Sequence, residues 1–319
     1  MDLRQLRYFK VLATHQHFGR AAAVLAIAQP ALSRQIQLLE TELGVRLVER
    51  HPRGASLTPE GELLLDRASF LLRYSDQVKI DIKDLQGAPR GPVVLGLPPS
   101  LTTLFGLPLG QRISERYPEI RLRLTERFWP GLPDALQQGL VDLAVLSGHH
   151  EPTALVHTKA LVSEQICVIG PLGDPRLEVE SFDIRRLRNI PLILTGQPNA
   201  GVGLALERAA ARADVVFDER MTVESALVAA EIVSAGLGWM IHFAAAVRRE
   251  IDAGLLRAVP ITGLSLDRQL AYAVQRPPSR ATTALISLIS EITEDLVTAG
   301  RWPGASLPRP VCIEAPFIV

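Results

Sequence analysis

Cysteine is scarce in this 319-residue sequence: the only two, Cys167 and Cys312, lie far apart along the chain. They are too few for a disulfide framework and lack the paired spacing of a zinc site, so we expect a reducing compartment and no metal. No apolar run approaches the roughly 20 residues that cross a bilayer. The first residues also carry no apolar signal segment. We therefore expect a cytoplasmic protein without a membrane partner.

An excess of charge of one sign is also missing, because 34 Lys and Arg residues balance 34 Asp and Glu residues. This balance excludes a protein that coats nucleic acid electrostatically along its whole length, but it allows a local basic face. Apolar residues make up 47% of the chain, which is ample for a packed core. The length corresponds to about two domains.

Common catalytic signatures are absent as well. The sequence contains no G-x-S-x-G, no Walker-type glycine-rich loop, no H-E-x-x-H and no G-x-G-x-x-G. An enzyme built on the C-terminal region is thus a disfavoured alternative, and we expect neither enzymatic activity nor a cofactor. A cysteine redox sensor is another alternative. It is disfavoured because Cys167 lies in an apolar run and Cys312 in a proline-rich tail, without the basic surroundings that activate a thiol.

Apolar spacing over the first 58 residues predicts several short helices followed by a β-ribbon. The small residues Ala21 and Ala22 allow one short helix to pack closely across the next. Pro30 suits the first turn of that next helix, and Gly44 ends it. The sequence therefore predicts a helix-turn-helix whose ribbon has a basic tip.

The helix that begins near Gln29 is expected to read DNA. Leu32, Ile36 and Leu39 point inward, which leaves Gln and Arg side chains on the other face. Such side chains form bidentate hydrogen bonds with adenine and guanine edges in the major groove. The ribbon arginines are expected to reach the flanking backbone or the minor groove. The predicted DNA-binding residues are Gln29, Pro30, Ser33, Arg34, Gln37, Arg50 and Arg53.

One long helix is predicted over residues 59–86, after the capping sequence Thr58-Pro59-Glu60. Its apolar positions repeat at alternating steps of four and three, and Ser75 is the weak point of this heptad seam. A lone helix of this length has nothing to bury the seam against, so we expect a dimerisation helix. The alternative is a packing helix inside a larger domain. The seam consists of Leu64, Ala68, Leu71, Ser75, Val78, Ile82 and Leu85.

From residue 92 onward, β-rich runs alternate with helical segments, which predicts βαβ units and a parallel sheet. The stretch is long for one such sheet, so we expect two half-domains with a crossover near 161–164 and a return near 265–270. The predicted strands are 93–97, 120–125, 142–146, 165–169, 191–195 and 238–242. The predicted helices are 101–116, 132–138, 202–212 and 225–235.

Several segments closely resemble the LysR-type transcriptional regulators, and the resemblance covers essentially the whole chain. They are residues 1–9 (MDLRQLRYF), 28–36 (AQPALSRQI), 57–61 (LTPEG), 116–120 (RYPEI), 140–145 (LVDLAV) and 233–238 (VSAGLG). The family implies an α/β protein with an N-terminal winged helix-turn-helix, a long linker helix and a C-terminal effector domain of two subdomains resembling periplasmic binding proteins. It also implies a small-molecule co-inducer, double-stranded promoter DNA and RNA polymerase as partners, and homodimers that pair into homotetramers.

The resemblance divides the chain into four parts. We expect the DNA-binding domain at 1–58, the linker or dimerisation helix at 59–90, the effector domain at 91–305 and a tail at 306–319. Subdomain I comprises about 91–162 and 267–300, and subdomain II about 163–266. The family usually has Phe where Val48 stands and often Pro where His242 stands.

The effector is expected between the subdomains, beyond the carboxyl ends of the strands. Ser100 and Thr102 follow the strand at 93–97 and suit an anion, although Ser100 alternatively caps its own helix. Hydroxyls at a helix N-terminus bind anions without a cationic group, so we expect an organic acid. The remaining candidates are Thr195 and Gln197, suggested by the resemblance; Phe128, alternatively a packing residue; and His242, alternatively a structural histidine.

Overall fold

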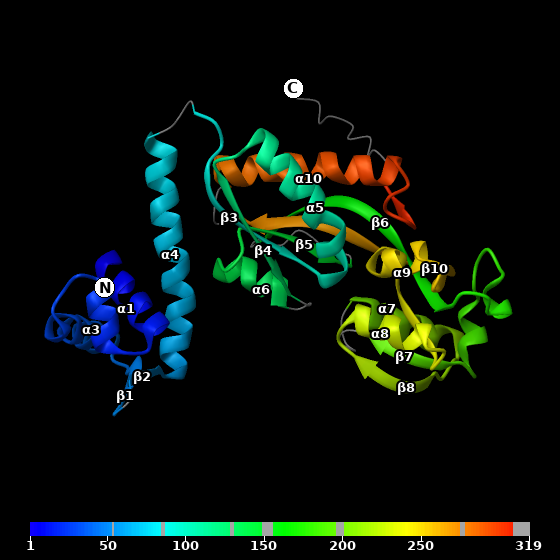
Figure 1. Cartoon of the computed structure of the whole chain (residues 1–319), viewed down its shortest axis with the longest axis horizontal. Helices are drawn as coiled ribbons and strands as arrows, with labels where there is room; N and C mark the ends of the chain where they lie inside the picture. Colours follow the sequence, from blue (N-terminus) through cyan, green and yellow to red (C-terminus); the bar gives the residue numbers. More distant parts are fainter. Residues whose placement is uncertain are drawn as a thin grey trace, which may run out of the picture.

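The computed structural model describes residues 1–52, 54–83, 87–127, 131–148, 156–195, 201–274 and 278–308. A small helical lobe at the N-terminus is followed by one long helix, which leads into a domain built on a large sheet (Figure 1). Within the described residues, no helix is long and apolar enough to cross a membrane.

The N-terminal lobe is a winged helix-turn-helix. Three helices, α1 (Leu3–His15), α2 (Phe18–Val24) and α3 (Gln29–Leu43), precede the antiparallel ribbon of β1 (Val48–His51) and β2 (Gly54–Leu57). Ala21 and Ala22 are buried between helices, as the sequence predicts. The core of this lobe contains Phe9, Leu12, Ala21, Ala22, Leu32, Ile36, Leu39 and Leu47.

Helix α4 (Pro59–Lys83) is the predicted long helix. The Thr58 hydroxyl accepts a 3.0 Å hydrogen bond from the Gly61 amide, which caps the first turn. On one side, Ala68 and Leu72 are buried against Leu6 of the N-terminal lobe. Three other seam positions, Leu71, Val78 and Ile82, are exposed in the single chain. The helix therefore presents one apolar face to its own lobe and leaves seam residues uncovered.

The C-terminal domain is built on a nine-stranded sheet with the order β4-β3-β5-β10-β6-β9-β7-β8, to which β11 is added beside β6. At each end of the sheet, three neighbouring strands run parallel to one another. The first group is β3 (Gly91–Leu97), β4 (Ile120–Glu126) and β5 (Leu143–Ser147). The second group is β7 (Pro191–Thr195), β8 (Asp218–Val223) and β9 (Trp239–Phe243).

Two long strands, β6 (Val156–Pro171) and β10 (Leu256–Ala273), run antiparallel to each other through both halves of the sheet. Their register shifts between Pro260 and Ser265, and again between Arg268 and Gln269. The expected crossover and return thus lie within these strands. The prediction of a parallel sheet is wrong for β6 and β10, because the chain passes between halves as continuous strands rather than through helical crossovers.

The helices distinguish two subdomains, each with its own core. In subdomain I, the helices α5 (Pro99–Arg116), α6 (Gly131–Gln138) and α10 (Arg280–Thr298) accompany β3, β4 and β5. In subdomain II, α7 (Gly201–Ala213), α8 (Ala226–Ser234) and α9 (Arg248–Asp252) accompany β7, β8 and β9. One core surrounds Leu95, Phe105 and Leu285, and another surrounds Phe182, Leu192 and Trp239.

Short elements complete the domain. Three single-turn helices, η1 (Pro175–Leu177), η2 (Ile184–Leu187) and η3 (Ala244–Val247), lie in subdomain II. The two-residue strand β11 (Ala305–Ser306) pairs with β6 next to Glu164 and Ser163. It brings the chain after α10 back to the middle of the sheet.

Candidate DNA interface and ligand cleft

Helix α3 presents a polar face to solvent. Gln29, Pro30, Arg34 and Gln37 are exposed and Ser33 is half-buried, whereas the apolar side of the helix lies in the core. Glutamine and arginine on an exposed helix face match the hydrogen-bonding pattern of base edges. The structure therefore places all five α3 residues predicted to bind DNA on accessible or half-accessible positions of one helix.

The N-terminus of α3 has no side-chain cap. Ala28 occupies the N-cap position, and its methyl group cannot accept a hydrogen bond from the first-turn amides. Free amides at a helix N-terminus attract phosphate through their partial positive charge. This end of α3 is suited to the DNA backbone.

Arg50 in the ribbon folds back onto the helix-turn-helix. Its Nη2 donates a 2.8 Å hydrogen bond to the Ser33 hydroxyl, and its guanidinium lies 4.5 Å from the centre of the Phe18 ring. The ribbon is thereby fixed beside the exposed face of α3. Arg53, the other predicted ribbon residue, lies outside the described residues.

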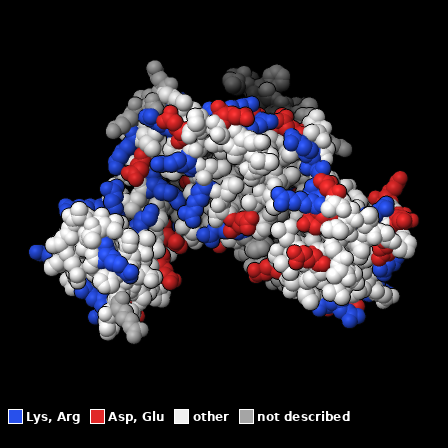
Figure 2. All heavy atoms as spheres, viewed as in Figure 1, with Lys and Arg blue, Asp and Glu red and all other residues white. Residues whose placement is uncertain are grey.

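Charge is distributed unevenly on the N-terminal lobe. Figure 2 shows Lys and Arg side chains at several places over the visible face of this lobe, and Asp and Glu side chains along the edge toward the C-terminal domain, where α4 lies. The sequence gives residues 1–53 eight basic and four acidic side chains. This local surplus, on a chain with no net charge, agrees with a basic face for nucleic acid.

A buried charged cluster lies where the long strands pass between the subdomains. Arg268 Nη2 on β10 is 2.7 Å from Glu164 Oε2 on β6, and both side chains are at most 1% exposed. The Arg268 guanidinium also donates to the hydroxyls of Ser147 and Ser100, which belong to subdomain I. On the other side it lies 4.0 Å from the centre of the Phe243 ring, in subdomain II. One guanidinium thus contacts both subdomains.

Ser100 lies in this cluster and not at the helix cap. Its hydroxyl accepts a 3.4 Å hydrogen bond from Arg268, whereas the N-cap residue of α5 is Pro98, which has no side-chain hydrogen bond. The alternative in which Ser100 caps its own helix is therefore wrong. The Thr102 hydroxyl donates to the Pro98 carbonyl, one turn earlier, at 3.5 Å. No side chain caps the start of α5, where the Leu101 amide donates to the Pro98 carbonyl at 2.9 Å.

Thr195 lies at the end of β7, where its hydroxyl donates to the Ile241 carbonyl at 3.5 Å. It lines a cavity of about 230 Å³ under α7, together with Leu206 and Phe217. Among the described residues, no hydrogen bond joins Thr195 to Ser100 or Arg268. The predicted residues Phe128 and Gln197 lie outside the described residues.

His242 lies on β9, next to Phe243, which contacts Arg268. Its ring packs edge-on against Phe243 at 5.4 Å, and no described residue pairs with its buried Nδ1. Burial, reinforced by the positive charge of Arg268, lowers the pKa of His242 from 6.5 to about 4. The imidazole is therefore neutral at physiological pH, close to the charged cluster.

Cys167, paired with His242 across the strands, is buried. Burial raises the pKa of its thiol to about 12. A thiol that stays protonated is a poor nucleophile, so this environment does not favour redox sensing at Cys167.

The sequence interpretation missed Arg268 and Glu164 and assumed an anion site without a cationic group. A signal was present, since each charge interrupts a largely apolar segment, at residues 161–169 and 264–273. A charge in a buried strand requires a partner, but one sequence does not reveal which residue across the sheet supplies it. Trp302, whose Nε1 donates to Glu164 at 2.9 Å, belongs to the same buried cluster.

Comparisons with known proteins agree with this architecture. Residues 3–62 match the model of the bacterial regulatory helix-turn-helix proteins of the lysR family, and residues 86–294 match the LysR substrate binding domain. The nitrogen assimilation regulatory protein nac of Escherichia coli (strain K12) is 28% identical over 308 residues, which cover 95% of this chain and 99% of that protein. The uncharacterized HTH-type transcriptional regulator YybE of Bacillus subtilis (strain 168) is 32% identical over 241 residues, covering 75% and 81%.

A solved structure has the same fold over nearly the whole chain. Full-length CbnR in complex with its target DNA matches with a TM-score of 0.68 at 19% identity, covering 92% of this chain and 99% of that one. A winged helix-turn-helix joined by a long helix to a two-subdomain binding domain defines a transcriptional regulator with an effector-binding domain. The chain belongs to the LysR family of transcriptional regulators.

Proposed function

We propose that this LysR-type regulator binds promoter DNA through α3 and the ribbon, and that an organic acid bound between its subdomains modulates that binding. The proposed DNA contacts are Gln29, Pro30, Ser33, Arg34, Gln37, Arg50 and Arg53. The corresponding domains are 1–58, 59–90 and 91–305, followed by a tail at 306–319. The proposed setting is the cytoplasm, with homodimers or homotetramers acting on RNA polymerase and no catalytic step.

One observation carries the choice of an anionic effector: the Arg268 guanidinium contacts Ser100 of subdomain I and Phe243 of subdomain II. The uncapped start of α5 lies beside it and adds partial positive charge. Because Arg268 is already paired with Glu164 and at most 1% exposed, a carboxylate in this position is held mainly by the Ser100 hydroxyl and the start of α5. Thr102, Thr195, Gln197, Phe128 and His242 remain proposed effector residues.

The effector alters DNA binding only if it favours one arrangement of the subdomains over the other. A site whose walls come from both subdomains meets that requirement, because a tilt between them changes its shape. In a tetramer, such a tilt changes the spacing of the helix-turn-helix pairs, and paired units read half-sites at fixed helical-turn separations.

The test is a footprint of the full chain on the DNA upstream of its own gene, over a salt series and with a panel of organic acids. We expect a protected, roughly palindromic site whose affinity falls steeply with salt. Ser100→Ala should keep the footprint and lose the response to the acid. The matched control, Thr103→Ala on the exposed side of α5, should keep both. An unaltered acid response in Ser100→Ala would place the effector elsewhere.

A further inference from the structure

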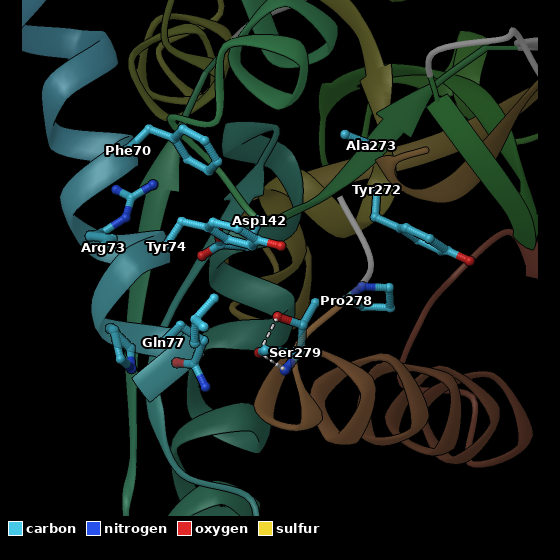
Figure 3. Close-up of a pocket in the computed structure, with 12 residues that line it drawn as sticks. Phe70, Arg73, Tyr74, Gln77, Asp142, Tyr272, Ala273, Pro278 and Ser279 are labelled. Atoms are coloured by element: carbon cyan, nitrogen blue, oxygen red, sulfur yellow. Dashed lines mark hydrogen bonds between the residues drawn. The ribbon is translucent and has the colours of Figure 1, made fainter. Parts of the chain in front are cut away.

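A second cavity lies between α4 and subdomain I, and it shares no described lining residue with the Arg268 cluster. Figure 3 shows Phe70, Tyr74 and Gln77 projecting from α4 toward Asp142 and the start of α10. The volume is about 180 Å³. The lining thus joins a helix of the linker to strands and a helix of the effector domain. Its described residues are Phe70, Arg73, Tyr74, Gln77, Val78, Pro92, Asp142, Tyr272, Ala273, Pro278, Ser279 and Thr282.

Three of the twelve described lining residues of this linker cavity are aromatic. Phe70 and Tyr74 are stacked, with ring centres 5.8 Å apart, and Tyr272 packs at 5.1 Å against His157. Flat rings of this kind favour a flat aromatic ligand through stacked or edge-on contacts. A cavity of about 150 Å³ holds one benzene molecule. The linker cavity therefore has room for one six-membered ring with a small substituent.

The polar groups of the described lining favour a neutral ligand. Its two charged side chains are Arg73, which donates to the Gly139 carbonyl, and Asp142, which accepts a 2.7 Å hydrogen bond from the Val94 amide. Their charges cancel, so an ion entering the cavity would bring an uncompensated charge. The carboxamide of the buried Gln77 and the hydroxyl of Ser279, which caps α10 by accepting a 3.1 Å hydrogen bond from the Thr282 amide, add uncharged polar groups to the lining.

We propose that the linker cavity is a second ligand site, which takes a neutral, planar, single-ring aromatic molecule with a carboxamide or hydroxyl substituent. This site goes beyond the proposed function, since it lies outside the effector cleft and takes a different chemical class. Because its walls come from α4 and from the effector domain, an occupant fixes the direction of the helix relative to subdomain I. The site thereby couples ligand binding to the placement of the DNA-binding lobe.

The experiment uses fluorine NMR on the full chain with three probes of equal ring size: 3-fluorobenzamide, 3-fluorobenzoate and 3-fluorobenzylamine. We expect one 3-fluorobenzamide per chain, bound at least about tenfold more tightly than either charged probe. Tyr74→Ala removes one wall and should weaken 3-fluorobenzamide binding by about tenfold, whereas Tyr74→Phe should retain it. Tyr74 is 41% exposed, so its removal is compatible with folding. Leu63→Ala, on the exposed side of the same helix, is the matched control and should change nothing.

Three results would overturn the proposal. The first is the absence of saturable 3-fluorobenzamide binding. The second is binding that Tyr74→Ala leaves unchanged but Ser100→Ala abolishes, which would place the ring in the effector cleft. The third concerns Val78, which lines the cavity and also belongs to the heptad seam. If 3-fluorobenzamide binds only after Leu71→Asp has separated the chains, a second copy of α4 fills the cavity.

Discussion

Arg268 and Glu164 form an ion pair 2.7 Å long in which neither side chain is more than 1% exposed. It joins β10 to β6 where these strands link the two subdomains. The second carboxylate oxygen of Glu164 accepts a 2.9 Å hydrogen bond from Trp302 Nε1. Each charge therefore depends on the other for its partner, because little water reaches the pair.

Glu164→Gln should strongly destabilise the effector domain, since it leaves the Arg268 charge buried without its counter-ion. We expect the free energy of unfolding to fall by about 3–5 kcal/mol. Urea unfolding followed by tryptophan fluorescence measures the change, because Trp302 contacts Glu164 directly. The matched control is Glu291→Gln, which removes an exposed carboxylate that pairs with Arg116 and Arg112 and should cost no more than about 1 kcal/mol. If both variants lost the same free energy of unfolding, burial of the Arg268–Glu164 pair would not be the cause of the destabilisation.

Arg34→Ala should weaken sequence-specific DNA binding. Arg34 is exposed on α3, and an arginine that pairs with a guanine edge contributes about 1–3 kcal/mol of discrimination. Affinities for the operator and for a scrambled duplex, measured by fluorescence anisotropy, provide the comparison. We expect a loss on the operator and little change on the scrambled DNA.

Arg50→Ala provides the comparison, because Arg50 lies on the ribbon and is expected to reach the flanking backbone or the minor groove; a backbone contact gives the following result. The substitution should weaken binding to the operator and to the scrambled duplex by similar factors. It should also reduce the slope of log affinity against log salt concentration by about one. If Arg34→Ala instead behaved like Arg50→Ala, then Arg34 would be a backbone contact and the reading face would need to be reassigned.

Much of the fold follows from local patterns in the sequence. The capping residue Thr58, followed by Pro59, correctly predicted where α4 begins. The β7 strand was predicted at its observed bounds, 191–195, because a short β-branched and apolar run stands between turn residues. What local patterns did not predict is the pairing of β6 with β10, which joins segments about 100 residues apart. Register over such distances is set by tertiary packing rather than by local sequence.

The same distinction applies to the candidate sites. The exposed polar face of α3 was predictable because helical periodicity alone separates Leu32 and Ile36 from Arg34 and Gln37. The Arg268 cluster was not, since it brings together side chains from β10, β6, β5 and α5. The linker cavity likewise depends on how α4 lies against subdomain I, and no motif encodes that relationship.

Leu71→Asp should dissociate the dimer expected at the α4 seam. Leu71 is 37% exposed in the single chain, as expected for a side chain that a second copy covers. Burying a leucine contributes roughly 1.5–3 kcal/mol, and a dimer loses two such contacts, so the dissociation constant should rise by about 10²–10⁴. Sedimentation velocity over a concentration series measures it. Leu63→Asp, off the seam of the same helix, should leave the dimer intact, and an intact Leu71→Asp dimer would rule out this seam.

His242 should make the stability of the effector domain depend on pH. Its pKa is lowered to about 4 in the folded chain, by burial and then by Arg268, against an ordinary value of 6.5. Between these two values the unfolded chain binds the extra proton, so the contribution is complete above about pH 6.5 and is lost as the pH falls toward 4. The loss amounts to at most about 3 kcal/mol. His242→Gln should remove this part of the pH dependence, measured as the melting temperature of the effector domain between about pH 7 and pH 4.5. His51→Gln, in the DNA-binding lobe, should keep the wild-type dependence, and the same slope in His242→Gln would show that other groups cause it.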